Sequence, residues 1–204
     1  SDGDLMEGVS FEAAELAGLW KLGKLIYIFD DNNISIDGNV DKVSVTDQSA
    51  KFKSLGWHVQ EIDGHDETQI INAVKEAQDN TSKPSLIIAK STIGKYSPNK
   101  QNTSGVHGSP LGNDEMEKFL KNLGWFGDTF DHPQEIYEYF NEKRDTDNIQ
   151  HDEWLSLLED KKSTDDDFAK LWNQFHNKEI ELSNLHNNDN KATRVAGSEV
   201  LKSI

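Results

Sequence analysis

Short apolar runs alternate with amphipathic stretches through the first ninety residues. Apolar side chains recur at helical spacing over residues 9–22, at Ala13, Leu16, Leu19 and Trp20, and the pattern stops at Gly23. A continuous apolar run of aromatic and branched side chains follows at residues 25–29. This run is typical of a strand that is buried on both faces. The sequence therefore predicts a helix and then a buried strand, which leads directly into a polar tip at residues 30–33.

The same alternation continues. Thr46 is predicted to cap a helix, and residues 57–62 are predicted to form the next strand. Asp66 is predicted to cap a further helix, and Pro84 precedes a predicted strand at residues 85–89. Helices that alternate with short apolar strands are typical of right-handed crossovers. We therefore predict an α/β fold whose parallel sheet is flanked by helices.

The second half of the chain has a different character. Residues 91–111 form a long polar stretch with three glycines and two prolines, which is typical of a functional loop or a disordered segment. Asn113 is predicted to cap a helix that ends at Gly124, and amphipathic stretches continue to residue 175. The aspartate run 165–167 precedes the last stretch, where negative charge favours a helix N-terminus. We predict an acidic helical segment after the sheet.

These changes in character divide the chain. We assign residues 1–125 to the sheet domain, residues 126–184 to a helical extension, residues 185–192 to a linker and residues 193–204 to a new helix. The opening Ser1-Asp2-Gly3 is interpreted as a junction between a strand and a loop whose strand is missing. We therefore expect the chain to be a fragment of a longer protein. Missing strands would leave apolar sheet edges unpaired and the fragment poorly soluble.

Composition narrows the classes of partner. The net charge of −16 argues against non-specific binding to nucleic acid or to a membrane surface, because both need clustered cations. The chain has no cysteine, which removes disulfides, thiolate metal sites and cysteine nucleophiles, and which fits a cytoplasmic location. No apolar run approaches the length needed to span a membrane. A cofactor site is then what would separate an enzyme from an acidic α/β domain without one.

One pair of short motifs has the chemistry of such a site. Asp2 and Asn32 offer oxygen ligands, and two loop tips that carry them could share Mg²⁺ or Ca²⁺. Gly3 leaves room for a phosphate, and a backbone carbonyl just past Asn32 could supply a third ligand. In parallel sheets, ligands bind at the carboxyl ends of strands, where residues 30–33 fall. The alternative is that these are ordinary turn residues.

The surroundings of this pair resemble the thiamine-diphosphate motif in the form found in transketolases. The run from Asp2 to Gly8 leads into an alanine-rich helix, and Gly23-Lys24-Leu25-Ile26 leads to the tip and on to Gly38. The resemblance is dense over residues 1–125 and returns after the acidic helices. Further stretches match in the same order: Gly56-Trp57-His58, Thr92-Ile93-Gly94, Ser97-Pro98-Asn99-Lys100, Val106-His107-Gly108-Ser109-Pro110-Leu111, Ala192-Thr193-Arg194 and Ser198-Glu199-Val200-Leu201.

The resemblance implies roles for the residues of this site, which we call the clamp: Asp2, Gly3, Asn32 and Ile34. Asp2, the Asn32 side chain and the main-chain oxygen of Ile34 would hold Mg²⁺ or Ca²⁺. Gly3 would let the diphosphate of thiamine diphosphate approach the backbone, and Asn32 would also contact it. Two departures stand beside these matches. Ser1 lies where the family usually has glycine, and Asp4 replaces a common cysteine.

Other positions are implied to serve the cofactor, the substrate and the dimer. Ile36 and Ile93 would line the cofactor, while His107 would contact the diphosphate and reach the substrate. A lone histidine is more often structural, but His107 lies in a glycine-rich loop, and an imidazole there could move a proton. Arg194 would bind the sugar phosphate, because a guanidinium suits phosphate recognition. Glu7 would join a carboxylate network between subunits.

The implied activity is transfer of a two-carbon ketol unit from a ketose phosphate to an aldose phosphate by a homodimer. Residues 1–125 would be part of the diphosphate-binding domain, and residues 193–204 the start of the pyrimidine-binding domain. The fragment alone would be inactive, because the rest of the cofactor site is missing. Two alternatives stay open. One is a related thiamine-diphosphate enzyme, such as dihydroxyacetone synthase or deoxyxylulose-phosphate synthase, and the other is a non-catalytic interaction module.

Overall fold

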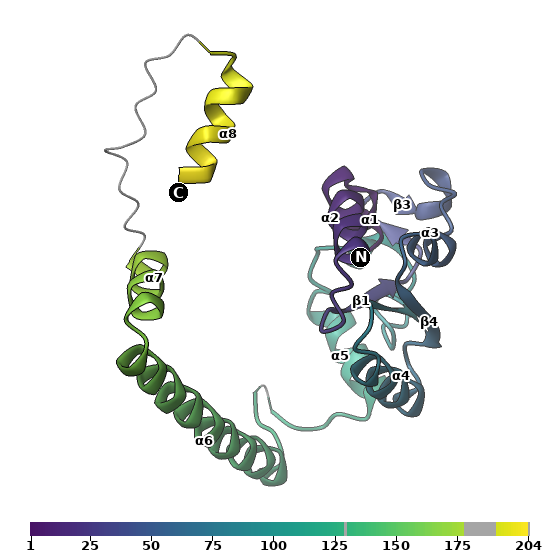
Figure 1. Ribbon diagram of the computed structural model, residues 1–204. Coiled ribbons are helices and arrows are strands. Elements are labelled where there is room, and N and C mark those ends of the chain that lie inside the picture. Colours follow the sequence, from purple (N-terminus) through teal and green to yellow (C-terminus); the bar gives the residue numbers. More distant parts are fainter. Residues whose placement is uncertain (129, 178–190, 204) are drawn as a thin grey trace. The chain divides into compact units, whose positions relative to one another are not determined.

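The computed structural model describes residues 1–128, 130–177 and 191–203. The chain divides into two compact units, Ser1–Gly127 and Asp128–Ile204, which are described separately (Figure 1). Most of the predicted linker, residues 185–190, lies outside the described residues. The domain boundaries near residues 125, 184 and 192 remain predictions.

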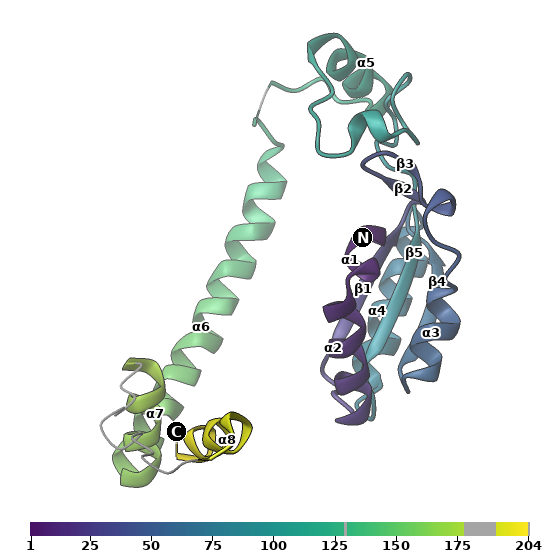
Figure 2. The same cartoon turned by 90° about the horizontal axis from the view of Figure 1, so that it is seen from above.

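The first unit is built on a three-stranded parallel sheet. The central strand is β5 (Ser85–Lys90), with β1 (Ile26–Asp31) on one side and β4 (His58–Asp63) on the other. Figure 2 shows the three strands with α1 beside β1 and α3 beside β4. The parallel sheet confirms the predicted α/β fold class. Leu86 and Ile87 of β5 are fully buried, because β5 has a neighbour on each side.

Strand β1 differs from its prediction. We expected it to be buried on both faces, but Phe29 is its one buried residue, and Ile28 is largely exposed. The reason is its position in the sheet. Among the described residues, β1 pairs with β5 alone and forms the edge. The apolar run thus predicts a strand, whereas the burial of its faces depends on the elements that lie beside it.

Helices cover both faces of the sheet. On one face, Phe52 and Trp57 pack against Phe29, Leu86 and Ile88. On the other face, Ala73 and Ala77 of the helix Glu67–Asp79 pack against Ile87. The elements of these two layers are α1 (Asp2–Met6), α2 (Gly8–Leu19), α3 (Gln48–Ser54) and α4 (Glu67–Asp79).

Helix α2 packs through small residues, not through the large apolar residues of its predicted stripe. Its buried residues are Ala14 and Ala17, while Leu19 is exposed. A Cβ atom on Gly18 would lie 1.9 Å from the carbonyl oxygen of Leu55. The backbone of α2 therefore lies close to the segment that connects α3 to β4. The indole Nε1 of Trp57 donates a 2.8 Å hydrogen bond to the carbonyl oxygen of Ala14. Close approach of the backbone selects small side chains on the buried face.

The helix starts test the predicted caps. Asp66 caps α4 as predicted, since its side chain accepts a 3.1 Å hydrogen bond from the backbone N–H of Gln69. The prediction for Thr46 is wrong, because Asp47 is the cap of α3 and accepts a 2.9 Å hydrogen bond from the Ala50 N–H. Both residues are good caps by type, so only the exact start of the helix decides between them.

The remaining elements of the first unit surround the carboxyl ends of the strands. Asn113 is the first residue of α5 (Asn113–Leu123) and not its cap, because Gly112, whose φ is 82°, occupies the N-cap position. The helix ends, as predicted, at left-handed Gly124. The short elements are β2 (Ile34–Ser35), β3 (Gly38–Asn39), η1 (Val40–Lys42) and η2 (Ser104–Val106), and β2 pairs with β3 as an antiparallel hairpin.

The second unit is helical. One helix of 31 residues, α6 (Gln134–Thr164), forms the first part of the predicted amphipathic stretches. It is followed by α7 (Asp166–Asn177), and α8 (Thr193–Ser203) ends the described chain. Asp165 accepts a 2.9 Å hydrogen bond from the Phe168 N–H, which confirms that the aspartate run starts a helix. No described helix is long and apolar enough to cross a membrane.

Candidate functional site

Asp2 and Gly3 lie in a helix and not on the predicted loop tip. Ser1 and Asp4 form a capping box, and the Asp4 carboxylate accepts hydrogen bonds from the Ser1 amino group at 2.9 Å and from the Ser1 hydroxyl at 2.6 Å. This arrangement starts the one-turn helix α1 at Asp2. The signal was present in the sequence, since serine followed three residues later by an acidic residue is a helix-start pattern.

The Asp2 carboxylate is buried and incompletely paired. Its residue is 7% exposed, and Oδ2 has no hydrogen-bond partner among the described residues. Burial, followed by repulsion from Asp31, raises the pKa of Asp2. A buried carboxylate oxygen without a partner is costly, and a bound cation would remove that cost. Asp2 therefore fits a cation ligand.

Asn32 is also buried and is held by its own chain. Its Oδ1 accepts a 3.0 Å hydrogen bond from the Ile34 N–H, and its Nδ2 donates a 3.2 Å hydrogen bond to Asp30. Oδ1 keeps a second lone pair. Helix α1 contacts both β1 and β2, the two strands on either side of Asn32. The fold thus brings Asp2 to the segment that carries Asn32 and Ile34.

Gly3 has free space on its Cα. A Cβ atom built there would meet no heavy atom within 4 Å, so no protein contact requires glycine at this position. The space beside the backbone is available to a ligand group. The approach of a phosphate at this position stays a prediction.

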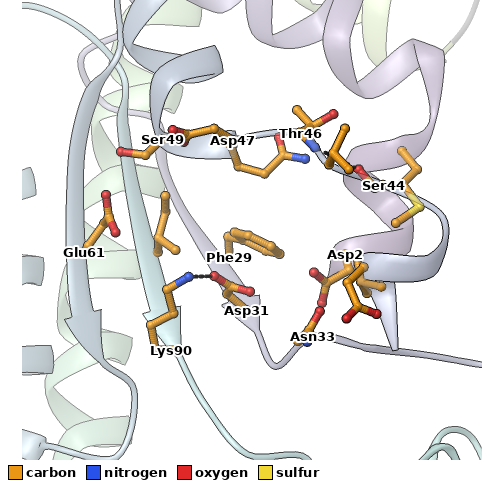
Figure 3. A pocket seen from close by; sticks show the side chains of 16 residues that line it. Asp2, Phe29, Asp31, Asn33, Ser44, Thr46, Asp47, Ser49, Glu61 and Lys90 are labelled. Atoms are coloured by element: carbon orange, nitrogen blue, oxygen red, sulfur yellow. Dashed lines mark hydrogen bonds and ion pairs between the residues drawn. The ribbon is translucent and has the colours of Figure 1, made fainter. Parts of the chain in front are cut away.

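A cavity of about 370 Å³ opens at the carboxyl ends of the strands, with Asp2 in its wall (Figure 3). Lys90 forms an ion pair with Asp31 across β1 and β5, and this contact raises the pKa of Lys90. Two further buried atoms, Gln48 Oε1 and Ser49 Oγ, lack partners among the described residues and belong to cavity-lining residues. The cavity is therefore lined by polar atoms that are ready to bind a ligand.

Sequence reasoning missed Lys90 and Glu61, which also line this cavity. Lys90 is the last residue of β5, and Glu61 lies near the carboxyl end of β4. The rule that placed residues 30–33 at the ligand-binding edge applies equally to these two strands. That rule was a usable signal for both residues.

The long polar stretch after β5 is an ordered loop that starts beside the clamp. Ser91 donates one hydrogen bond from its hydroxyl to Asp30 and another, 3.1 Å long, from its N–H to the Asp31 carbonyl. Ile93 and His107 are both partly buried in this loop. His107 ends η2 and donates a 3.0 Å hydrogen bond from its N–H to the Ser104 carbonyl.

Two expected site residues of the first unit, Ile36 and Glu7, have no described hydrogen bond or ion pair to the clamp. Ile36 is 71% exposed on the tip of the β2–β3 hairpin. Glu7 is exposed at the end of α1, and Arg194 is exposed on α8 in the second unit. In the described part of the chain, no group of three or more histidine, aspartate or glutamate side chains could hold a metal ion. A metal at Asp2 would therefore depend on amide, carbonyl and ligand oxygens, as Mg²⁺ commonly does.

Comparisons with known proteins place this chain in a family. The family described as "Transketolase, thiamine diphosphate binding domain" matches residues 1–180. Transketolase 1 of Pasteurella multocida is 51% identical over 143 residues, which cover 70% of this chain and 21% of that protein. The chain thus spans about a fifth of the length of the curated relatives that it matches.

Solved structures agree. Transketolase from Leishmania mexicana has a TM-score of 0.84 and 31% identity, covering 99% of this chain and 31% of that one. Transketolase in complex with sedoheptulose-7-phosphate from Pichia stipitis has a TM-score of 0.74 and 38% identity, covering 83% and 26%. Together with the buried Asp2, the polar cavity and the parallel sheet, these matches show that the chain belongs to the transketolase family, in its thiamine-diphosphate-binding domain.

Proposed function

We propose that the protein that carries this chain is a transketolase, and that the cavity edge beside Asp2 binds the diphosphate of thiamine diphosphate through a divalent cation. The observation that supports this most directly is the buried Asp2 Oδ2, which lacks a partner in the described structure at the rim of a polar cavity. The enzyme would move a two-carbon ketol unit from a ketose phosphate to an aldose phosphate.

Three oxygens would hold the cation: the Asp2 carboxylate, the Asn32 Oδ1 and the main-chain oxygen of Ile34. Oxygen donors of this kind suit Mg²⁺ or Ca²⁺, and diphosphate oxygens complete such shells. The cation would offset the repulsion between the diphosphate and the Asp2 carboxylate. The open space at Gly3 would receive the diphosphate, and Asn32 would also contact it.

The loop residues would act on the cofactor and the substrate. Ile93 and Ile36 would line the cofactor with apolar surface. His107 would contact the diphosphate and reach the substrate, where its imidazole could donate or accept a proton at a substrate oxygen. Thiamine diphosphate, when bound, supplies the carbanion nucleophile and the electron sink for carbon–carbon cleavage. The chain's own residues supply position and charge.

Further proposals concern substrate and assembly. Arg194 would bind the substrate phosphate through its fork of donors. The P. stipitis transketolase structure contains a sugar phosphate, which supports this substrate class. Glu7 would join a carboxylate network between the subunits of a cytoplasmic homodimer. Because each active site would draw on more than these residues, the chain alone is expected to lack activity.

The test uses the full-length protein with thiamine diphosphate and Mg²⁺. Ligand that binds only the folded state at 100 times its Kd stabilises it by about 2.7 kcal/mol, so the melting temperature should rise with ligand concentration. Ketol transfer from a ketose phosphate to an aldose phosphate should accompany this rise. Stabilisation without transfer would contradict the activity but not the cofactor site. Absence of both would favour a non-catalytic interaction module.

A further inference from the structure

Glu115 on α5 is a buried carboxylate whose hydrogen-bond partners among the described residues lie in the loop between β5 and α5. The residue is 7% exposed. It accepts hydrogen bonds from the hydroxyl of Ser97, from the Asn99 N–H at 2.8 Å and from the Asn99 Nδ2 at 2.9 Å. These donors, Ser97 first, lower the pKa of Glu115 to about 2, so the carboxylate is charged at neutral pH. A buried charge is thus used to hold one loop.

The contacts continue from Ser97 to Ile93. Ser97 is fully buried, and its N–H donates a 2.9 Å hydrogen bond to the Gly94 carbonyl. The Asn102 N–H donates a 2.8 Å hydrogen bond to the Ile93 carbonyl. The two ends of segment 93–102 are therefore joined by a hydrogen bond, and Glu115 binds this segment near its middle.

The same segment supports the residue before His107. Gly94 has φ of 64°, and a Cβ atom there would lie 3.1 Å from Cγ2 of Val106, so Val106 packs directly on the glycine backbone. The far end of the loop is tied back by Lys100, whose Nζ donates a 2.8 Å hydrogen bond to the Leu111 carbonyl. Ile93 and His107 thus belong to one packed loop. A second, exposed tie to α5 runs from Asn122 Nδ2 to the Tyr96 carbonyl at 2.9 Å.

We infer that Glu115 is a positioning residue of the cofactor site, which holds Ile93 and His107 in place by anchoring the loop that carries both. This inference rests on the proposed function, because Ile93 and His107 matter only if the cofactor binds beside them. Glu115 would act through Ser97 and Asn99, the residues from which its carboxylate accepts hydrogen bonds. A loop that is held in place by its own contacts lowers the ordering cost of binding.

The experiment compares Glu115→Ala, Glu115→Gln and the control Glu117→Ala in the full-length protein. Glu117 is exposed on the same helix, so its replacement makes the same charge change without touching the loop. Hydrogen exchange of residues 91–112, measured without cofactor, should rise at least about tenfold in Glu115→Ala. Thiamine-diphosphate affinity and kcat should fall, by up to about 100-fold for a displaced catalytic group. The control should match the unmodified protein.

In exchange, affinity and kcat, Glu115→Gln should lie between Glu115→Ala and the unmodified protein, because its amide oxygen can still accept hydrogen bonds from Ser97 and Asn99. If Glu115→Ala does not fold, Glu115→Gln is measured in its place. Unchanged hydrogen exchange of residues 91–112 in the Glu115 variants would show that Glu115 does not anchor the loop. Faster loop exchange with unchanged affinity and kcat would overturn the inference and leave the proposed function standing. If the unmodified protein binds no thiamine diphosphate, the proposed function fails, and the inference fails with it.

Discussion

The Nδ1 atom of His58 lies 3.2 Å from the Oγ atom of Ser85 at the amino end of the sheet, and its Nε2 lies 3.0 Å from Glu76. Serine, histidine and glutamate in this order resemble a nucleophilic triad. Ser85, however, is 0% exposed, and it lies at the end of β5 opposite Lys90 and the cavity. A substrate cannot reach that hydroxyl. The arrangement therefore ties β4 and β5 to α4 and has a structural role.

Replacing His58 with alanine should lower the free energy of unfolding by about 1–3 kcal/mol, because the buried Ser85 hydroxyl would lose its side-chain partner. Denaturant unfolding of the full-length protein measures this loss. Glu76→Gln should cost less than about 1 kcal/mol, since Glu76 is 63% exposed. The double variant His58→Ala/Ser85→Ala should recover part of the loss. A double variant less stable than the sum of its single changes would contradict this account.

Gly18→Ala should destabilise the protein by about 1–3 kcal/mol through overpacking, because the new Cβ would collide with the Leu55 carbonyl oxygen. Thermal unfolding measures the effect. The matched control is Gly8→Ala in the same helix, where a Cβ would meet no atom within 4 Å. The control should be neutral or slightly stabilising. Equal effects at both positions would show that the Gly18 contact does not matter.

Asp2→Asn should weaken binding of thiamine diphosphate with Mg²⁺ by about 2–5 kcal/mol, which is typical when one partner of a buried charge pair is removed. Stability without ligand should be equal or higher, because a desolvated charge with an unpaired oxygen is removed. Calorimetric titration and melting curves measure the two effects. Asp79→Asn, an exposed change of the same charge on α4, should alter neither. Tight binding by Asp2→Asn would exclude Asp2 as a cation ligand.

Glu115 predicts a specific dependence of stability on pH. Its pKa is lowered from 4.5 to about 2 in the folded protein, so the unfolded chain takes up the proton first as the pH falls. The stabilisation by the carboxylate is therefore complete above pH 4.5 and is lost between pH 4.5 and about pH 2. The stability difference between the unmodified protein and Glu115→Gln should shrink as the pH falls below 4.5. A difference that stays constant down to pH 3 would contradict the lowered pKa.

Local signals were enough for the sheet and for some helix ends. Asp66 and Gly124 act through hydrogen bonds to near neighbours in the chain, so their roles were predictable from short motifs. The burial of β1 was not predictable, because it depends on which strands lie beside it. The capping box of Ser1 and Asp4 was readable but was overlooked. Asp2 and Asn32 were predictable as cation ligands from their chemistry, and the resemblance narrowed the ligand to thiamine diphosphate, but their burial required the fold.

The role of Glu115 in holding the loop could not be predicted from the sequence. Glu115 is separated from Ser97 by 18 positions and from Asn99 by 16, so no local pattern distinguishes it from the exposed Glu117 beside it. Likewise, Ala14 and Ala17 were not separable from the larger apolar residues of α2 until the Leu55 carbonyl was placed against Gly18. Long-range contacts decide which of several similar side chains is used.

The strand order has a consequence for synthesis on the ribosome. Strands β1 and β4 both pair with β5, which is the last of the three to be made. At about 5–20 residues per second, several seconds pass between emergence of β1 and emergence of β5. During that time, neither finished strand has β5, its partner among the described residues. The nascent chain must therefore keep Phe29 and its neighbours from wrong contacts until the central strand arrives, and late pairing of this kind favours slow folding.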